Sequence, residues 1–220
     1  MYQKILLSCV SLICLLLSTR CAPAVTTQSQ AGQTSPQTMP EMARIRDLTW
    51  KPTMTQKDFD LTALTAYGSI SVALLSVDDV REDTRLIGKA YEDQKVRDKM
   101  VPIATKVNVA KWCKNSFEKA FQLLNIKSDP AKGRLRISIE ISEFSIFDDF
   151  TQTGTATLRV TANNSDEMMI WEGQIKASSD LYVHETQSDG ISECLSNTAL
   201  MVIYAMFTEQ SFKDAVIKSL

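Results

Sequence analysis

Three stretches in the second half of the chain alternate between apolar and polar residues. They are Arg134–Phe147, Thr153–Ala162 and Met168–Val183, and a slip near Glu143 interrupts the first of them. A period of two is typical of strands that bury one face, and a slip in that period is typical of a β-bulge. Because short polar turns separate the stretches, the pattern predicts an antiparallel meander with a bulge in its first strand.

A further strand is predicted near the start of the domain. In Gly68–Val77, apolar residues occur on both sides of the alternation, which favours a central strand with helices on one face. The polar segment from Asp78 to Gly88 is predicted to be a loop, and Met100–Thr105 a short additional strand.

Apolar residues recur at helical spacing between these two groups of strands. Over residues 107–126 the apolar stripe includes Cys113, Phe117 and Phe121, and several lysines lie opposite. This arrangement predicts an amphipathic helix with one face on the core.

A second long helix is predicted near the C-terminus. Ser188 or Asp189 can cap its first turn, and its sequence includes Ala199–Phe207, which is apolar all round. A shorter helical segment is predicted over residues 212–220. The order of elements is then β-α-β-β-β-α. It favours an α+β fold, a two-layer sandwich with a mostly antiparallel sheet of about four strands and two long helices on one face.

The N-terminus has the pattern of a secretory signal over residues 1–20. Lys4 precedes an apolar run, Ile5–Leu17, that is shorter than a membrane span. Two processing routes stay open. The segment Leu17–Cys21 resembles a bacterial lipobox, with Arg20 as a departure from it, and would make Cys21 the lipidated first residue of the mature chain.

The other route is ordinary cleavage after Ala24, at an A-x-A-like site, which would release a soluble periplasmic protein. Residues 21–66 are predicted to form a flexible tether and then an irregular entry to the domain, because the first part is uncharged and rich in Thr, Gln, Ser and Pro. The chain of 220 residues then has room for one domain, which we place at residues 67–220.

Composition argues against several classes of function. Removal of the signal takes Lys4 and Arg20 from the 24 basic residues and leaves 22 against 26 acidic ones. A slightly acidic chain lacks the basic surface expected of a nucleic-acid binder. With a single His and seven Gly, we expect no enzyme activity, no catalytic residues, no cofactor and no metal site.

The two cysteines of the mature domain leave two alternatives. Cys113 and Cys194 both lie on or beside the apolar face of a predicted helix. In an oxidising compartment they could form one disulfide, or they could stay buried as free thiols that pack like small apolar side chains.

Charged residues form two weak candidates for chemistry. Acidic and basic side chains alternate from Asp78 to Arg85. Paired carboxylates there could hold calcium or transfer protons, but no calcium-loop pattern is present, which favours a solvated loop with local salt bridges. His184 has no second His or matched Cys pair that would predict a metal site.

Two aromatic residues are candidates for contact with a partner. Trp112 lies off the stripe of its helix, and aromatic residues on a polar flank are enriched at interfaces; burial at the edge of the domain is the alternative. Tyr204 lies in the apolar run Ala199–Phe207, which either is buried on all sides or forms a subunit or partner interface.

Five segments stand out by their order and spacing: Ile70–Gly88, Lys114–Leu124, Arg134–Phe147, Trp171–Gln174 and Gln210–Lys218. On these segments, over about residues 68–219, the chain resembles the YajG family of bacterial outer-membrane lipoproteins. More loosely, it is similar to the N-terminal domain of TolB and to LpoB-type lipoproteins.

This resemblance implies a lipid-anchored domain at the periplasmic face of the outer membrane and supplies no catalytic residues. We therefore expect a non-catalytic module that binds an envelope protein during envelope assembly or maintenance, with a homo-oligomer also possible. The alternative is an auxiliary lipid- or solute-binding lipoprotein of a transport system, in which the apolar side of the helix pair holds acyl chains.

Overall fold

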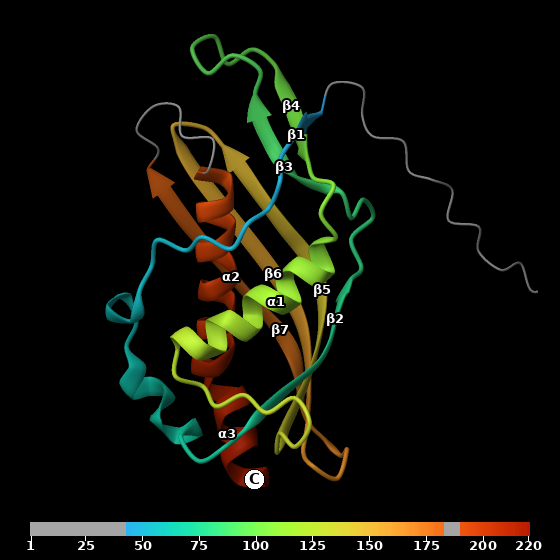
Figure 1. Cartoon of the computed structure of the whole chain (residues 1–220), viewed down its shortest axis with the longest axis vertical. Coiled ribbons are helices and arrows are strands. Elements are labelled where there is room, and N and C mark those ends of the chain that lie inside the picture. Colours follow the sequence, from blue (N-terminus) through green and yellow to red (C-terminus); the bar gives the residue numbers. More distant parts are fainter. Residues whose placement is uncertain (1–42, 183–189) are drawn as a thin grey trace, which may run out of the picture. The chain divides into compact units, whose positions relative to one another are not determined.

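The computed structural model describes residues 43–182 and 190–220. These residues form a seven-stranded sheet with α-helices packed on one of its faces (Figure 1). The strands are β1 (Arg44–Ile45), β2 (Val72–Asp79), β3 (Leu86–Tyr91), β4 (Met100–Ala104), β5 (Leu135–Asp148), β6 (Thr151–Asn163) and β7 (Met169–Tyr182). The helices are the 3-10 helices η1 (Gln56–Asp58) and η2 (Leu61–Tyr67) and the α-helices α1 (Val109–Leu123), α2 (Gly190–Thr208) and α3 (Gln210–Ser219).

The α+β class is confirmed, whereas the predicted sheet is wrong in size and in strand direction. The sheet has the order β1-β4-β3-β5-β6-β7, and β2 also pairs with β5. The pairs β1–β4, β2–β5 and β3–β5 are parallel, so the sheet is mixed and not mostly antiparallel. Two strands, β1 and β3, were absent from the prediction, while the short strand β4 is confirmed.

The meander of β5, β6 and β7 is confirmed together with its bulge. Both pairs are antiparallel, and the register of β5 against β6 shifts between Ile141 and Glu143. The shift lets Leu135, Ile137 and Ile139 bury their side chains on the helix-covered face before the bulge. Phe144 and Ile146 do the same after it.

The strands β2 and β3 lie one after the other along the same edge of β5. The pairing of β2 ends with Asp79 opposite Ile141, and that of β3 begins with Gly88 opposite Ile146. Gly88 has a φ of 152°, and a side chain there would collide with the carbonyl of Ile146. The segment predicted as one loop is therefore a short break of about six residues between two parallel strands.

The helix α1 forms as its pattern predicts. The Asn108 side chain accepts a hydrogen bond from the backbone N–H of Lys111 at 2.8 Å and so caps the first turn. Cys113, Phe117 and Phe121 are completely buried against the sheet and α2.

The helix α2 is apolar all round because it is covered on both sides. It is the one described helix that is long and apolar enough to cross a membrane, but most of that stretch is buried inside the domain. β6 and β7 pack on one side of it and α1 on another. Most side chains of the run Ala199–Phe207 are therefore buried, as the alternative of a core helix predicts.

The remaining side of α2 is covered by residues 46–67, which we call the strap. Side chains of α2 hold it: the Ser192 hydroxyl accepts from the N–H of Thr49 at 3.2 Å, and the Ser196 hydroxyl from that of Lys51 at 2.9 Å. Leu48, Phe59, Leu64 and Tyr67 of the strap are buried in the core. The segment expected to be an irregular entry is thus a packed layer of the domain.

Candidate functional site

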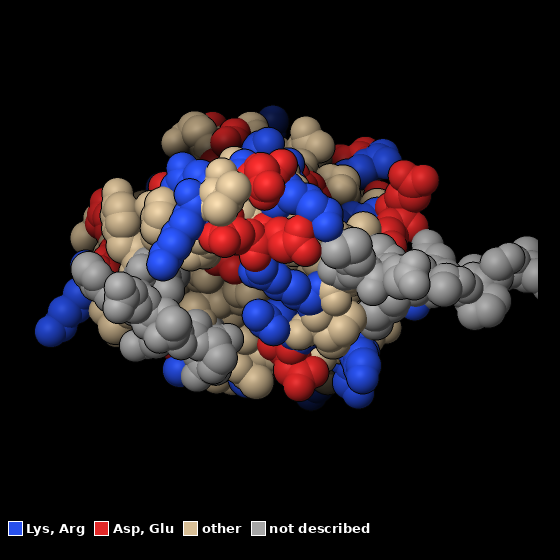
Figure 2. All heavy atoms as spheres, turned by 90° about the horizontal axis from the view of Figure 1, so that it is seen from above, with Lys and Arg blue, Asp and Glu red and all other residues tan. Residues whose placement is uncertain are grey.

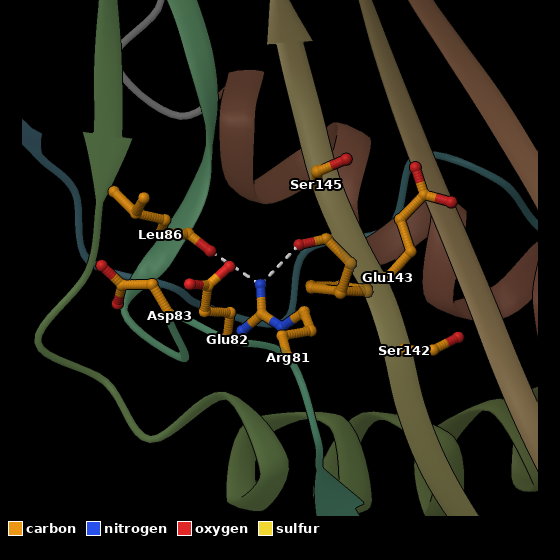
Figure 3. A pocket seen from close by; sticks show the side chains of 8 residues that line it. Arg81, Glu82, Asp83, Leu86, Ser142, Glu143 and Ser145 are labelled. Atoms are coloured by element: carbon orange, nitrogen blue, oxygen red, sulfur yellow. Dashed lines mark hydrogen bonds between the residues drawn. The ribbon is translucent and has the colours of Figure 1, made fainter.

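A notch lies at the break between β2 and β3, and Arg81 is one of the residues that line it (Figure 3). The guanidinium donates two hydrogen bonds of 2.7 Å to the Asp79 carboxylate. It donates three more to backbone carbonyls: to Leu86 at 2.7 Å, to Phe144 at 2.8 Å and to Thr84 at 3.0 Å. A guanidinium has five N–H donors, and all of them are used.

Arg81 thus supplies a donor to the Phe144 carbonyl of β5 where the strand pairing is interrupted. The ion pair with Asp79 is buried, since the side chains of Arg81 and Asp79 are only 10% and 6% exposed. The prediction of a solvated loop with local salt bridges is therefore wrong for this pair. Its saturated donors hold the fold and have no capacity left for a ligand.

The other charged groups around the notch are also engaged. Glu143 accepts a hydrogen bond from the Thr157 hydroxyl at 2.8 Å and lies 3.6 Å from the Lys176 ammonium. Asp83 pairs with Arg85 at 4.0 Å. Within residues 43–182 and 190–220, no three His, Cys, Asp or Glu side chains come together as metal ligands would.

The two cysteines are buried free thiols, so the disulfide that the sequence allowed is not formed. The Cys194 thiol lies 3.4 Å from the carbonyl oxygen of Gln152 on β6, whereas Cys113 lies on α1. Burial raises the pKa of the Cys113 thiol far above its ordinary value and raises that of Cys194 to about 11. High pKa values and burial make both thiols poor nucleophiles.

The two aromatic candidates for partner contact have different surroundings. Trp112 is 7% exposed, and its ring packs 5.6 Å from Phe144 and 6.5 Å from Trp50 of the strap. The partner-contact interpretation of Trp112 therefore gives way to burial at the edge of the domain. Tyr204 is half-buried, with its ring 4.9 Å from Phe59, and its contact with a partner stays a prediction.

A cluster that the sequence did not reveal lies at one end of the sheet. It consists of Tyr91, Arg97, Phe147, Asp149 and Phe150, which we call the aromatic tip. The Arg97 guanidinium lies 4.5 Å from the ring centre of Phe150 and 5.7 Å from that of Tyr91. It also bonds to the Asp149 carboxylate at 2.9 Å. Tyr91 in turn packs edge-on against Phe147 at 5.8 Å.

Local backbone geometry fixes the centre of the aromatic tip. Arg97 lies in the turn between β3 and β4 with a φ of 54°, and its N–H donates to the carbonyl of Asp93 at 2.9 Å. Phe150 lies in the two-residue turn between β5 and β6 and is 59% exposed. An exposed phenylalanine ring held by an arginine is thus presented at the surface in a defined orientation.

The end of the domain that carries the aromatic tip displays charges of both signs. Seen from above, Lys and Arg side chains alternate with Asp and Glu side chains (Figure 2). A surface that binds nucleic acid would be expected to carry a large positive field. This end of the domain has no large field of one sign.

The tip was missed because its residues come from separate segments. Tyr91 and Arg97 follow Gly88, in a region for which no strand was predicted, and Phe150 follows a predicted turn. A large apolar residue directly after two aspartates in a hairpin turn is the one signal that the sequence contains. Two other candidates, Cys21 and His184, lie outside the described residues.

Comparison with known proteins does not assign a family. No protein-family model matches the chain, and no curated protein is similar to it. A DUF330-family protein from Xanthomonas campestris is 11% identical, covers 81% of this chain and 94% of its own, and has a TM-score of 0.44. A PelC dodecamer from Paraburkholderia phytofirmans is 9% identical, covers 63% of this chain and 86% of its own, and has a TM-score of 0.37.

The lipoprotein GNA1162 from Neisseria meningitidis is 9% identical to this chain, covers 53% of it and 88% of its own length, and has a TM-score of 0.24. The structural neighbours thus include lipoproteins, but all three similarities are remote. The resemblance to the YajG family stays a prediction.

Proposed function

We propose that this protein is a non-catalytic, protein-binding module of the bacterial cell envelope. A lipid on Cys21 holds it at the periplasmic face of the outer membrane, and it contacts an envelope protein through the aromatic tip. The carrying observation is the exposed Phe150 ring fixed by Arg97. Phe, Tyr and Arg are among the residues enriched at protein interfaces relative to the rest of the surface.

The tip suits protein contact because its side chains are already ordered. The ion pair between Arg97 and Asp149 and the stacking on Phe150 restrict the rotamers of all three residues. A surface ordered before binding loses less conformational entropy when a partner docks. The mixture of charges at this end of the domain (Figure 2) would supply the polar rim of such an interface.

The position of the N-terminal chain supports an anchor on this side. The first described strand, β1, pairs with β4, and β4 follows the turn that carries Arg97 of the aromatic tip. The Arg44 guanidinium donates a hydrogen bond to the carbonyl of Glu92 in the same turn at 2.7 Å. The predicted tether therefore joins the domain close to the aromatic tip. A flexible chain of about 20 residues spans roughly 25 Å, which would keep the tip near the membrane surface.

The alternative of an acyl-chain carrier is less well supported. It requires an open apolar side on the helix pair, and the strap covers that side with buried Leu48, Phe59 and Tyr67. An acyl chain could enter there only if the strap left α2, which would break its hydrogen bonds to Ser192 and Ser196.

Site-specific photo-crosslinking in the native cells tests the protein contact. A photoreactive phenylalanine analogue replaces Phe150 in the full chain, and the same analogue replaces Met168 as a control. Both side chains are 59% exposed, but Met168 lies in the turn before β7. We expect a discrete protein adduct from position 150 and none from position 168. Equal adducts at both positions, or adducts with lipid alone at 150, would contradict the proposal.

The anchor is tested separately by intact mass and detergent phase partitioning. The chain with its own leader is compared with Cys21→Ala. We expect a diacylated Cys21 that takes the protein into the detergent phase, and a water-soluble variant. An unmodified product that begins after Ala24 would refute the anchor. The protein contact at the aromatic tip would then depend on the photo-crosslinking result alone.

A further inference from the structure

The strand β7 forms one border of the sheet, and its outer edge is unpaired. β7 pairs with β6 on one side, and no strand follows it in the sheet (Figure 1). In residues 43–182 and 190–220, no backbone hydrogen bond reaches that edge from another element. The N–H and C=O groups along it are therefore available for pairing with a further strand.

Between Trp171 and Tyr182 this edge has neither a bulge nor a proline, although it carries charged side chains and its register against β6 shifts once before Trp171. β7 has 14 residues, contains no proline, and keeps a continuous register with β6 from Trp171 to Tyr182. Its one glycine, Gly173, is explained inside the domain, because a side chain there would collide with the Trp171 ring. A long and regular edge of this kind is normally blunted by bulges, prolines or a covering segment.

The charges along β7 of one copy are complementary to those along β7 of a second, antiparallel copy. On the open face of the sheet, Glu172, Gln174 and Lys176 follow one another, opposite Thr161, Arg159 and Thr157 of β6. If two copies pair antiparallel about Gln174, each Glu172 lies opposite Lys176 of the other copy. Within the domain Glu172 pairs with Arg159 at 2.6 Å and Lys176 lies 3.6 Å from Glu143, but the two side chains remain 39% and 67% exposed, so both can also reach across.

We propose that two copies of this chain join along β7 in an antiparallel pair centred on Gln174, which forms one continuous sheet. The helix-facing side fits the same register, because Trp171 lies opposite Ala177 of the second copy and Ile175 opposite Gly173. Trp171 thus meets a small residue, while Gly173 is already covered by the Trp171 ring of its own chain. Pairing about Lys176 would instead place lysine against lysine, which is destabilising.

Oxidative cross-linking of the full chain in the cell envelope tests the register. In an antiparallel pair the two Cα atoms at the centre lie roughly 4.5–5.5 Å apart, and a disulfide accepts that range. We expect Gln174→Cys to give a dimer on a non-reducing gel. Ser138→Cys, on the same open face but in the central strand β5, should give none. The native Cys113 and Cys194 are buried and provide the background.

Charge exchange tests the complementarity by sedimentation of the purified full chain in detergent. Lys176→Glu turns two attractive pairs into repulsive ones, so we expect the dimer Kd to rise roughly tenfold. The double variant Glu172→Lys, Lys176→Glu restores opposite charges and should restore the dimer, whereas Lys132→Glu, which is outside β7, should leave it unchanged.

Three outcomes would overturn the proposal: a wild-type monomer at the highest attainable concentration, no cross-link at position 174, or a Lys176→Glu variant as dimeric as the wild type. None of these measurements depends on Cys21 or on the aromatic tip. Failure of the dimer and failure of the proposed function are therefore distinguishable.

Discussion

Replacement of Arg81 by methionine removes the group that spans the break between β2 and β3. The methionine retains most of the apolar stem but leaves the Asp79 carboxylate, which is 6% exposed, without its ion-pair partner. It also removes the donors to the carbonyls of Phe144 and Leu86. Removal of one partner of a buried ion pair costs about 3–5 kcal/mol of the free energy of unfolding.

Urea unfolding followed by tryptophan fluorescence measures this loss. With a slope of roughly 2 kcal/mol per M, typical of a domain of this size, the midpoint should fall by about 1.5–2.5 M while the slope stays constant. The rate of amide hydrogen exchange should rise most in β3, because the pairing of β3 with β5 is short and begins beside the lost guanidinium.

A second variant separates the buried charge from the lost volume. In the double variant Asp79→Asn, Arg81→Met, no uncompensated charge remains, so we expect it to be more stable than Arg81→Met alone. Arg159→Met is the exposed control, because its ion pairs with Glu172 and Glu140 lie on the open face of the sheet. A loss below about 1 kcal/mol in Arg81→Met would refute the structural role of this residue.

Three further predictions concern the packing of α2. Asn197→Ala removes the oxygen that accepts from two backbone N–H groups of the strap, so hydrogen exchange in the strap should rise and stability fall by about 1–3 kcal/mol. Gly154→Ala places a carbon 2.0 Å from the Thr198 hydroxyl; the melting temperature should fall, and Thr198→Ala should partly restore it. Burial raises the pKa of Cys194 from 9.0 to about 11. The thiol therefore ionises first in the unfolded state, and stability should fall by about 1.4 kcal/mol per pH unit between those values, less so in Cys194→Ala.

The parts of the fold that the sequence predicted are those governed by local periodicity. β5, β6 and β7 alternate over most of their length, and the bulge near Glu143 interrupts that alternation visibly. β3 was missed because it pairs with β5 over only three residues, starting at a glycine that the close approach of Ile146 requires. No periodic pattern marks a strand of that kind.

The candidate site was less predictable than the fold. Trp112 is off the apolar stripe of α1, and its burial depends on Trp50 and Phe144, which are distant in the sequence. The aromatic tip likewise unites Arg97 and Phe150, which belong to two different turns. Contacts between such positions follow from strand pairing, which residue spacing along one segment does not specify.

The sequence by itself determined the α+β class, the meander of the last three strands and the amphipathic α1. These features follow from apolar residues that recur with the period of a strand or a helix. Only the tertiary structure decided that β2 and β3 share one edge of β5, that Arg81 fills the break between them, and that the strap covers α2. The physical reason is that hydrogen-bond donors and apolar surfaces are satisfied by whatever segment the fold brings near, and that segment is chosen by the packing of the whole domain.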